Sequence, residues 1–84
     1  MGDGEGAIKD YTKAISIDEN YSSALYNRAF SLKLMGNYTD ALKDANSLLE
    51  INSDNPENWN LKGNIQLLFG DYFEAIESYS KAID

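Results

Sequence analysis

The side chains that could do chemistry in this chain are carboxylates, amides, hydroxyls and lysines. The sequence contains no cysteine and no histidine, which removes thiolate metal sites, disulfides and the usual neutral-pH general base. Two carboxylate pairs, Asp40/Asp44 and Glu74/Glu77, are spaced so that both members lie on one helix face. We interpret both pairs as exposed, solvated charge and not as a catalytic acid and base.

An oxygen-rich turn is the other candidate for chemistry. Asn52, Asp54 and Asn55 cluster there, but the turn lacks the glycine and the terminal glutamate of a calcium loop. The chain also has no glycine-rich phosphate loop and no set of nucleophile and base. We therefore expect no enzyme activity, no metal and no cofactor.

The net charge of the chain argues against certain classes of partner. The 84 residues carry 14 acidic and 7 basic side chains, a net charge of −7. Such a surface repels nucleic acid and anionic membranes, so we expect neither as a partner. Two readings of the acidity stay open, which are simple solubility and a preference for a basic partner.

Targeting signals are also missing. No apolar run approaches the roughly 18 residues of a membrane span. Residues 1–6 lack the basic and apolar regions of a secretory signal, and Gly6 stands where an N-myristoylation signal has Ser or Thr. We expect a soluble, intracellular, cytoplasmic protein.

The sequence repeats itself with a period of 34 residues. Gly-Asn-Tyr at 36–38 recurs as Gly-Asp-Tyr at 70–72, and Asp-Ala-Leu at 40–42 recurs as Glu-Ala-Ile at 74–76. Across two periods, Tyr-Thr-Lys-Ala-Ile at 11–15 matches Tyr-Ser-Lys-Ala-Ile at 79–83. Several independent matches at one offset indicate a true repeat.

Each unit is predicted to contain two helices. Leu25, Ala29 and Leu32 have the spacing of one helix face. Gly36 and Gly70 follow the first helix of their units, where a left-handed residue ends a helix and glycine adopts that conformation without steric cost.

The starts of two helices carry capping residues. Asn37 is predicted to cap the second helix of its unit, with Asp40 as its reciprocal partner. Asn55 is predicted to cap a helix that begins at Pro56, a residue suited to the first turn.

Small residues recur where two helices of a hairpin must cross closely. They are Ala29 and Gly63 on the first helices, and Ala7, Ala41 and Ala75 on the second helices. Together with Trp59, Gly70, Tyr72, Tyr79 and Ala82, and with the period of 34, this pattern resembles the tetratricopeptide repeat signature. The resemblance implies an all-α fold, a right-handed α-solenoid of antiparallel helix hairpins with about two and a half units and five helices. It also implies a scaffold or interaction module whose partner is another protein or a peptide.

In this register the chain is a single domain over residues 1–84. Residues 1–21 hold the second helix of a partial repeat, 22–55 a complete repeat and 56–84 a nearly complete one. The last helix presents Ile76, Tyr79 and Ile83 with nothing after it to cover them. Two explanations stay open: a fragment of a longer protein, or self-association into a homo-oligomer through these three residues.

The first helix of each unit is expected to line the concave side of the solenoid. Its inward positions are Ser23, Tyr26, Phe30 and Lys33 in one unit, and Glu57, Asn60, Asn64 and Leu67 in the next. Tyr26 and Phe30 could stack on a peptide side chain while Lys33 holds an acidic group, and the two asparagines could hydrogen-bond a peptide backbone. The alternative is that the aromatic rings pack into the core and Lys33 is a solvated charge.

A sharper hypothesis concerns the carboxylate clamp that chaperone-binding members of the family use, built from lysine, asparagine and arginine of successive repeats. Asn27 matches the asparagine of the clamp's middle repeat, but Glu57 and Leu61 stand where a basic pair should follow. Read one repeat later, Asn64 matches the first asparagine, yet Asn60 replaces its lysine. The resemblance therefore implies an incomplete clamp.

Overall fold

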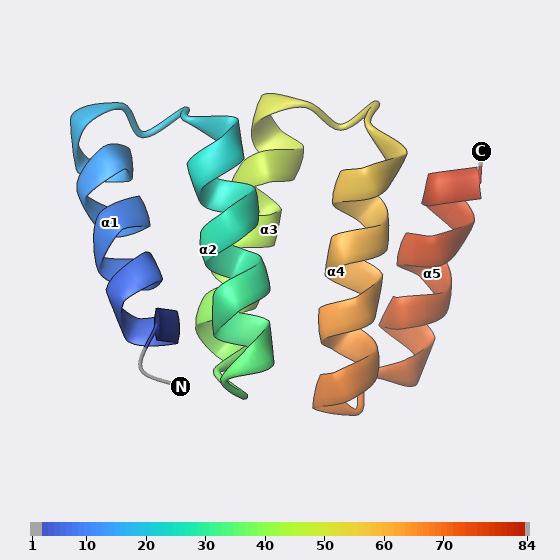
Figure 1. The fold of residues 1–84 in the computed structure, drawn as a ribbon. Helices are drawn as coiled ribbons and strands as arrows, with labels where there is room; N and C mark the ends of the chain where they lie inside the picture. The colour runs from blue at the N-terminus through green and yellow to red at the C-terminus, as the bar shows by residue number, and fades with distance from the viewer. Residues whose placement is uncertain (1–2, 84) are drawn as a thin grey trace.

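The computed structural model describes residues 3–83 and contains five α-helices over that range (Figure 1). They are α1 (Asp3–Ile17), α2 (Ser22–Leu34), α3 (Tyr38–Ile51), α4 (Pro56–Phe69) and α5 (Tyr72–Ile83). The described part of the chain contains no strand, which confirms the all-α fold. The two ends of the predicted domain, Met1 and Gly2 at its start and Asp84 at its end, lie outside the described residues.

The two glycines that end α2 and α4 have the predicted conformation. Gly36 has φ 84° and Gly70 has φ 98°, both left-handed. The N–H of Gly70 and the N–H of Asp71 both donate to the carbonyl of Gln66, at 3.0 and 2.9 Å. These bonds satisfy a carbonyl that the ending helix would otherwise leave without a partner.

The two predicted caps have different outcomes. Asn55 caps α4 as predicted, because its side-chain oxygen accepts from the N–H of Glu57 at 3.0 Å and Pro56 is the first helical residue. The reciprocal cap at Asn37 is wrong, since its side chain accepts no backbone N–H and its Nδ2 donates to Asp40 Oδ2 at 2.9 Å. The backbone of Asn37, at φ −90° and ψ 72°, lies outside the extended region that N-caps usually adopt.

The helices stack in a row of hairpins (Figure 1). α2 pairs with α3 and α4 with α5, while α1 packs against α2, α3 packs against α4, and α2 lies beside α4. The core between them consists of apolar residues from α2, α3 and α4, namely Leu25, Ala29, Leu32, Ala41, Ala45, Leu48, Leu61 and Ile65. Each hairpin therefore buries its apolar face against its neighbours, which is how a solenoid is stabilised.

The predicted small residues of the two complete hairpins are buried between their helices, while Ala7 on α1 is half-buried. Ala29, Ala41 and Ala75 are at most 1% exposed. A Cβ atom built on Gly63 would lie 2.8 Å from Cε1 of Tyr79, a distance that real Cβ contacts do not reach. Gly63 is thus the residue that lets α4 and α5 approach each other.

Membrane-spanning helices and clusters of acidic side chains were the other features of interest in residues 3–83. None of the helices in this range is both long and apolar enough to cross a membrane. No group of acidic side chains among these residues is arranged to hold a metal ion.

Candidate peptide-binding face

The predicted binding residues lie on two helices that pack side by side, α2 and α4. We call their shared surface the α2–α4 face. It comprises Ser23, Tyr26, Asn27, Phe30 and Lys33 from α2, and Glu57, Asn60, Asn64 and Leu67 from α4.

The two aromatic side chains of α2 differ in their surroundings. Tyr26 is half-buried and packs against the hydrophobic core. This agrees with the alternative prediction that the aromatic rings of α2 pack into the core. Phe30 remains 37% exposed, and the ammonium nitrogen of Lys33 lies 4.4 Å from the centre of its ring. The Phe30 ring and the Lys33 ammonium therefore form one cation–π unit at the surface.

A small hollow separates the beginnings of α2 and α4. Its volume is about 210 Å³. Its walls are Ser22, Ser23, Tyr26, Leu48, Asn52, Asn55, Glu57 and Asn58. The structure thus brings together three of the predicted residues, Ser23, Tyr26 and Glu57, around a space with mostly polar walls.

The α4 part of the face carries amide and apolar side chains. Asn60 and Asn64 are both exposed, one helical turn apart. The side-chain oxygen of Asn64 accepts a hydrogen bond from the hydroxyl of Tyr79, so its NH2 group is the remaining donor of that side chain. Leu67 is 46% exposed at the end of the row.

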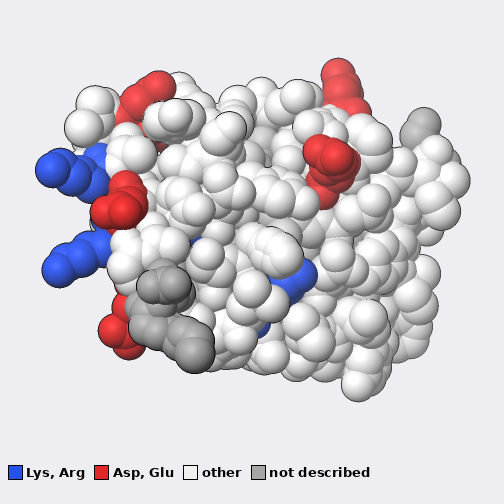
Figure 2. Space-filling model, viewed as in Figure 1, with Lys and Arg blue, Asp and Glu red and all other residues white. Residues whose placement is uncertain are grey.

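Charge is sparse on the α4 and α5 side of this view. Figure 2 shows acidic and basic groups gathered over α1 and a broad uncharged surface over α4 and α5. Of the nine residues of the α2–α4 face only Lys33 and Glu57 are charged, with opposite signs. A ligand on the α2–α4 face would therefore be recognised through hydrogen bonds and aromatic contact more than through an electrostatic potential of one sign.

The three residues proposed for self-association do not share one environment. Ile76 and Ile83 are 61% and 86% exposed, and Tyr72 on the same helix is 63% exposed. Tyr79 is half-buried inside its own hairpin, against Gly63 and Asn64. The placement of Tyr79 at an uncovered end is therefore corrected, because the missing side chain of Gly63 lets its ring enter the hairpin.

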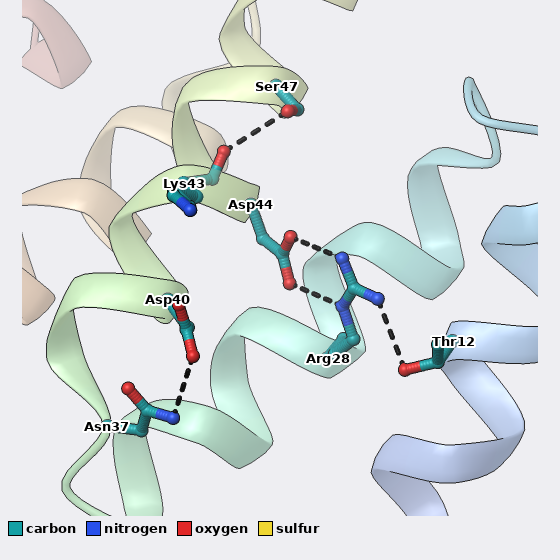
Figure 3. A network of polar contacts seen from close by, with 7 residues as sticks. All are labelled: Thr12, Arg28, Asn37, Asp40, Lys43, Asp44 and Ser47. Carbon is teal, nitrogen blue, oxygen red and sulfur yellow. Dashed lines mark hydrogen bonds and ion pairs between the residues drawn. The ribbon is translucent and has the colours of Figure 1, made fainter.

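The interpretation of Asp44 as exposed, solvated charge is wrong. Asp44 is 4% exposed, and its two carboxylate oxygens accept from Nε and NH2 of Arg28, each at 2.7 Å. The NH1 group of Arg28 also donates to the hydroxyl of Thr12 at 3.1 Å, so the guanidinium links α1, α2 and α3 (Figure 3). The hydrogen bonds and charge of Asp44 raise the pKa of Arg28, although burial alone would lower it.

The other three carboxylates of the two predicted pairs are exposed as expected, namely Asp40, Glu74 and Glu77. One feature of the sequence could have indicated that Asp44 is buried. Arg28 is the only arginine of the chain, and it follows the core residue Leu25 by three positions. A guanidinium there can turn back along the hairpin toward a carboxylate 16 residues away.

The repeat pattern of the whole chain matches known family models. The model described as "Tetratricopeptide repeat" matches residues 22–55 and 56–84, and the model described as "TPR repeat" matches residues 1–36. The chain belongs to the tetratricopeptide repeat family. This confirms the family predicted from the sequence and makes the chain a protein-interaction module.

Several relatives of this tetratricopeptide repeat chain are known. Heat shock protein STI1 of Saccharomyces cerevisiae is 36% identical over 83 residues, covering 98% of this chain and 14% of that protein. Hsp70-Hsp90 organizing protein 3 of Arabidopsis thaliana is 31% identical over 77 residues, covering 92% of this chain and 14% of that protein. The chain thus spans about one-seventh of the length of these relatives.

A solved structure shares the fold. The crystal structure of MamA superimposes with a TM-score of 0.91 and 23% sequence identity, over 98% of this chain and 48% of that one. The agreement confirms the solenoid of helix hairpins for this tetratricopeptide repeat chain.

Proposed function

We propose that the α2–α4 face binds an extended peptide segment of a partner protein. The observation that carries the proposal is the exposed Phe30 ring with the Lys33 ammonium 4.4 Å from its centre, on a face otherwise made of amide and hydroxyl groups. Exposed aromatic rings among hydrogen-bonding side chains are the common anchors of peptide recognition.

The roles of the individual residues follow from their chemistry. Phe30 stacks on an apolar or aromatic side chain of the peptide, and Lys33 holds an adjacent acidic group. Asn60 and the NH2 group of Asn64 bond the peptide main chain, while the hollow beside Tyr26 takes a small side chain. Affinity then comes from the aromatic contact and specificity from the hydrogen bonds.

The test begins with peptides selected from a random display library on the immobilised chain. Binding of a selected peptide is then measured by fluorescence anisotropy against Phe30→Ala and Asn60→Ala. We expect a loss of about tenfold for Phe30→Ala and twofold to tenfold for Asn60→Ala, the ranges of an anchor ring and of a hydrogen bond. Phe73→Ala is the matched control, because Phe73 is 85% exposed on α5, outside the face.

Two results would contradict this function. One is a set of selected peptides whose affinity changes with Phe73→Ala and not with Phe30→Ala. The other is a library that yields no binder although the chain keeps the helix content of the fold.

A second candidate is structural self-assembly through α5. Tyr38, Leu42 and Leu49 of α3 are half-buried because α4 packs on that helix. The residues one period later, Tyr72, Ile76 and Ile83, are 63%, 61% and 86% exposed. A second copy that covers this stripe would remove the exposed apolar surface from water.

A third candidate is a chaperone adaptor, suggested by relatives named Hsp70-Hsp90 organizing proteins. Two residues argue against a complete carboxylate clamp in this segment. Leu61 is 3% exposed within the core, and Glu57 would repel a carboxylate. Binding of an acidic C-terminal tail peptide that disappears in moderate salt would favour this candidate over the others.

A further inference from the structure

Corresponding cations in the two hairpins have different partners. Arg28 of α2 is held by both carboxylate oxygens of Asp44, at 2.7 Å each (Figure 3). One period later the cation is Lys62 of α4, and the place of Asp44 is taken by Ser78. The Ser78 hydroxyl is buried and donates to Gln66 Oε1 at 2.7 Å. The second hairpin therefore has the cation without the internal carboxylate.

A second cation lies near the same indole ring as Lys62. The ammonium nitrogens of Lys62 and Lys81 lie 5.7 and 5.0 Å from the ring centre of Trp59. Lys81 of α5 stands where the first hairpin has Ser47. Two like charges near one indole ring repel each other, and an anion between or beside them relieves that repulsion.

The indole ring of Trp59 is an apolar surface with a fixed orientation beside Lys62 and Lys81. The residue occupies the position of Leu25, which is 2% exposed in the first hairpin, whereas Trp59 is only half-buried. Its indole Nε1–H donates to the carbonyl of Ser53 at 2.7 Å, which sets the orientation of the ring. The indole can pack against the methylene groups of an acidic side chain while the ammonium groups contact its carboxylate.

An open hollow of about 430 Å³ lies beside Trp59 and Lys62. Its walls are Asn46, Leu49, Glu50, Ser53, Trp59 and Lys62. Glu50 is its one acidic wall residue, and it forms no ion pair with either lysine, since Arg28–Asp44 is the only ion pair among residues 5–83, whose side chains the structure describes. Lys62 thus stands in the wall of the hollow with no carboxylate paired to it among residues 5–83, while Lys81 lies against the same indole ring from α5.

We propose that this hollow, which we call the Trp59 hollow, binds a carboxylate side chain of an acidic partner peptide. The external carboxylate takes the part that Asp44 plays for Arg28 in the first hairpin. Lys62 in the wall of the hollow contacts the carboxylate, Lys81 adds its positive charge from beside the indole ring, and Trp59 contacts the aliphatic stem. The Trp59 hollow uses none of the nine residues of the α2–α4 face, so the two sites can be tested independently.

The test uses Trp59, the only tryptophan of the chain, as its own reporter. The full chain is titrated with end-blocked Ala-Glu-Glu-Ala and with the isosteric Ala-Gln-Gln-Ala, while indole fluorescence and the indole N–H resonance are followed. A saturable change is expected with the glutamate peptide alone. Lys62→Gln and Lys81→Gln should each weaken it about twofold to fivefold, the range of a partly exposed ion pair. Lys43→Gln, an exposed lysine of α3 outside the hollow, is the matched control.

Two more variants separate binding from a merely structural role. Glu50→Gln removes the one acidic wall group and should tighten binding by a similar factor, a gain that damage to the fold would not produce. The double variant Lys62→Arg with Ser78→Asp reproduces the internal pair of the first hairpin and should abolish the response. Circular dichroism confirms that each variant keeps its helix content.

Several outcomes would overturn the proposal. An equal response to the glutamine peptide would show that no carboxylate is recognised, and an equal effect of Lys43→Gln would show only diffuse attraction. Tighter binding of a phosphoserine peptide of the same length would assign the hollow to phosphate. Absence of any saturable response in the unmodified chain would remove the site altogether.

Discussion

At the residue scale, the Arg28–Asp44 pair and the bond from Arg28 to Thr12 link three helices through polar contacts. The guanidinium bonds Asp44 of α3 through two nitrogens and Thr12 of α1 through the third. The side chains are 21% and 6% exposed, so the pair is largely shielded from water. Removing one partner leaves a buried charge without compensation.

The first prediction concerns this pair. Asp44→Ala should lower the free energy of unfolding by about 2–4 kcal/mol, near the lower part of the range for a broken buried pair because Arg28 keeps some contact with water. A double-mutant cycle with Arg28→Ala, measured by urea denaturation, should give a coupling energy of about 1–3 kcal/mol. Asp40→Ala is the control, since Asp40 is exposed; a coupling near zero would contradict the role of the pair.

The pKa of Arg28 sets the pH range of that contribution. Its folded-state pKa is raised above the ordinary arginine value by Asp44. A raised pKa means that the stabilisation is complete below the unfolded pKa and is lost only as the pH rises through the folded value. The part of the stability that depends on ionised Arg28 should therefore be constant through neutral pH and decrease only in strong alkali, which urea titrations of the unmodified chain and Arg28→Ala can measure.

The second prediction concerns glycines in two helices. Gly63→Ala places a Cβ atom 2.8 Å from the ring of Tyr79, whose hydroxyl is held by Asn64. We expect a loss of about 1–3 kcal/mol in unfolding free energy, the cost of overpacking. Gly6→Ala is the matched control, because nothing lies within 4 Å of its Cβ, and it should gain about 0.5–1 kcal/mol of helix propensity. Equal effects in thermal denaturation would show that Tyr79 moves aside freely.

At the element scale, the third prediction compares the residues that precede α3 and α4. Asn55→Ala removes the bond from its side chain to the N–H of Glu57 and should cost about 1 kcal/mol. Asn37→Ala removes only an exposed bond to Asp40 and should cost no more than about 0.5 kcal/mol. Urea denaturation of both variants compares the two helix starts directly. A larger loss for Asn37→Ala would mean that α3 depends on the amide of Asn37 as a cap in solution.

At the scale of the whole molecule, the exposed stripe of α5 decides whether the chain associates with itself. The fourth prediction is that its apparent mass in sedimentation equilibrium rises with concentration if α5 is an interface. Ile76→Asp should then restore the monomer mass, because a carboxylate cannot be buried there unpaired. Ile17→Asp, at a site 80% exposed on α1, is the control. A constant monomer mass over a hundredfold concentration range would contradict self-assembly and leave the α2–α4 face free for a peptide.

Much of this architecture was determined by local features of the sequence. The period of 34 indicated the repeated helix hairpins, and Gly36, Gly70 and the cap at Asn55 located the ends of α2 and α4 and the start of α4 to within about a residue or two. Helix periodicity, left-handed glycine conformations and capping act between neighbours in the chain, so they can be recognised without knowledge of the fold.

The tertiary structure alone decided what each helix face meets. Asp44 and Asp40 share one helix face in sequence, yet Asp44 is buried on Arg28 and Asp40 stays in water. Tyr79 entered its hairpin because Gly63 leaves room for the ring. Lys62 and Lys81 converge on Trp59 from two helices. Periodicity fixes which residues share a face, but the partner of that face depends on how hairpins distant in sequence are placed in space.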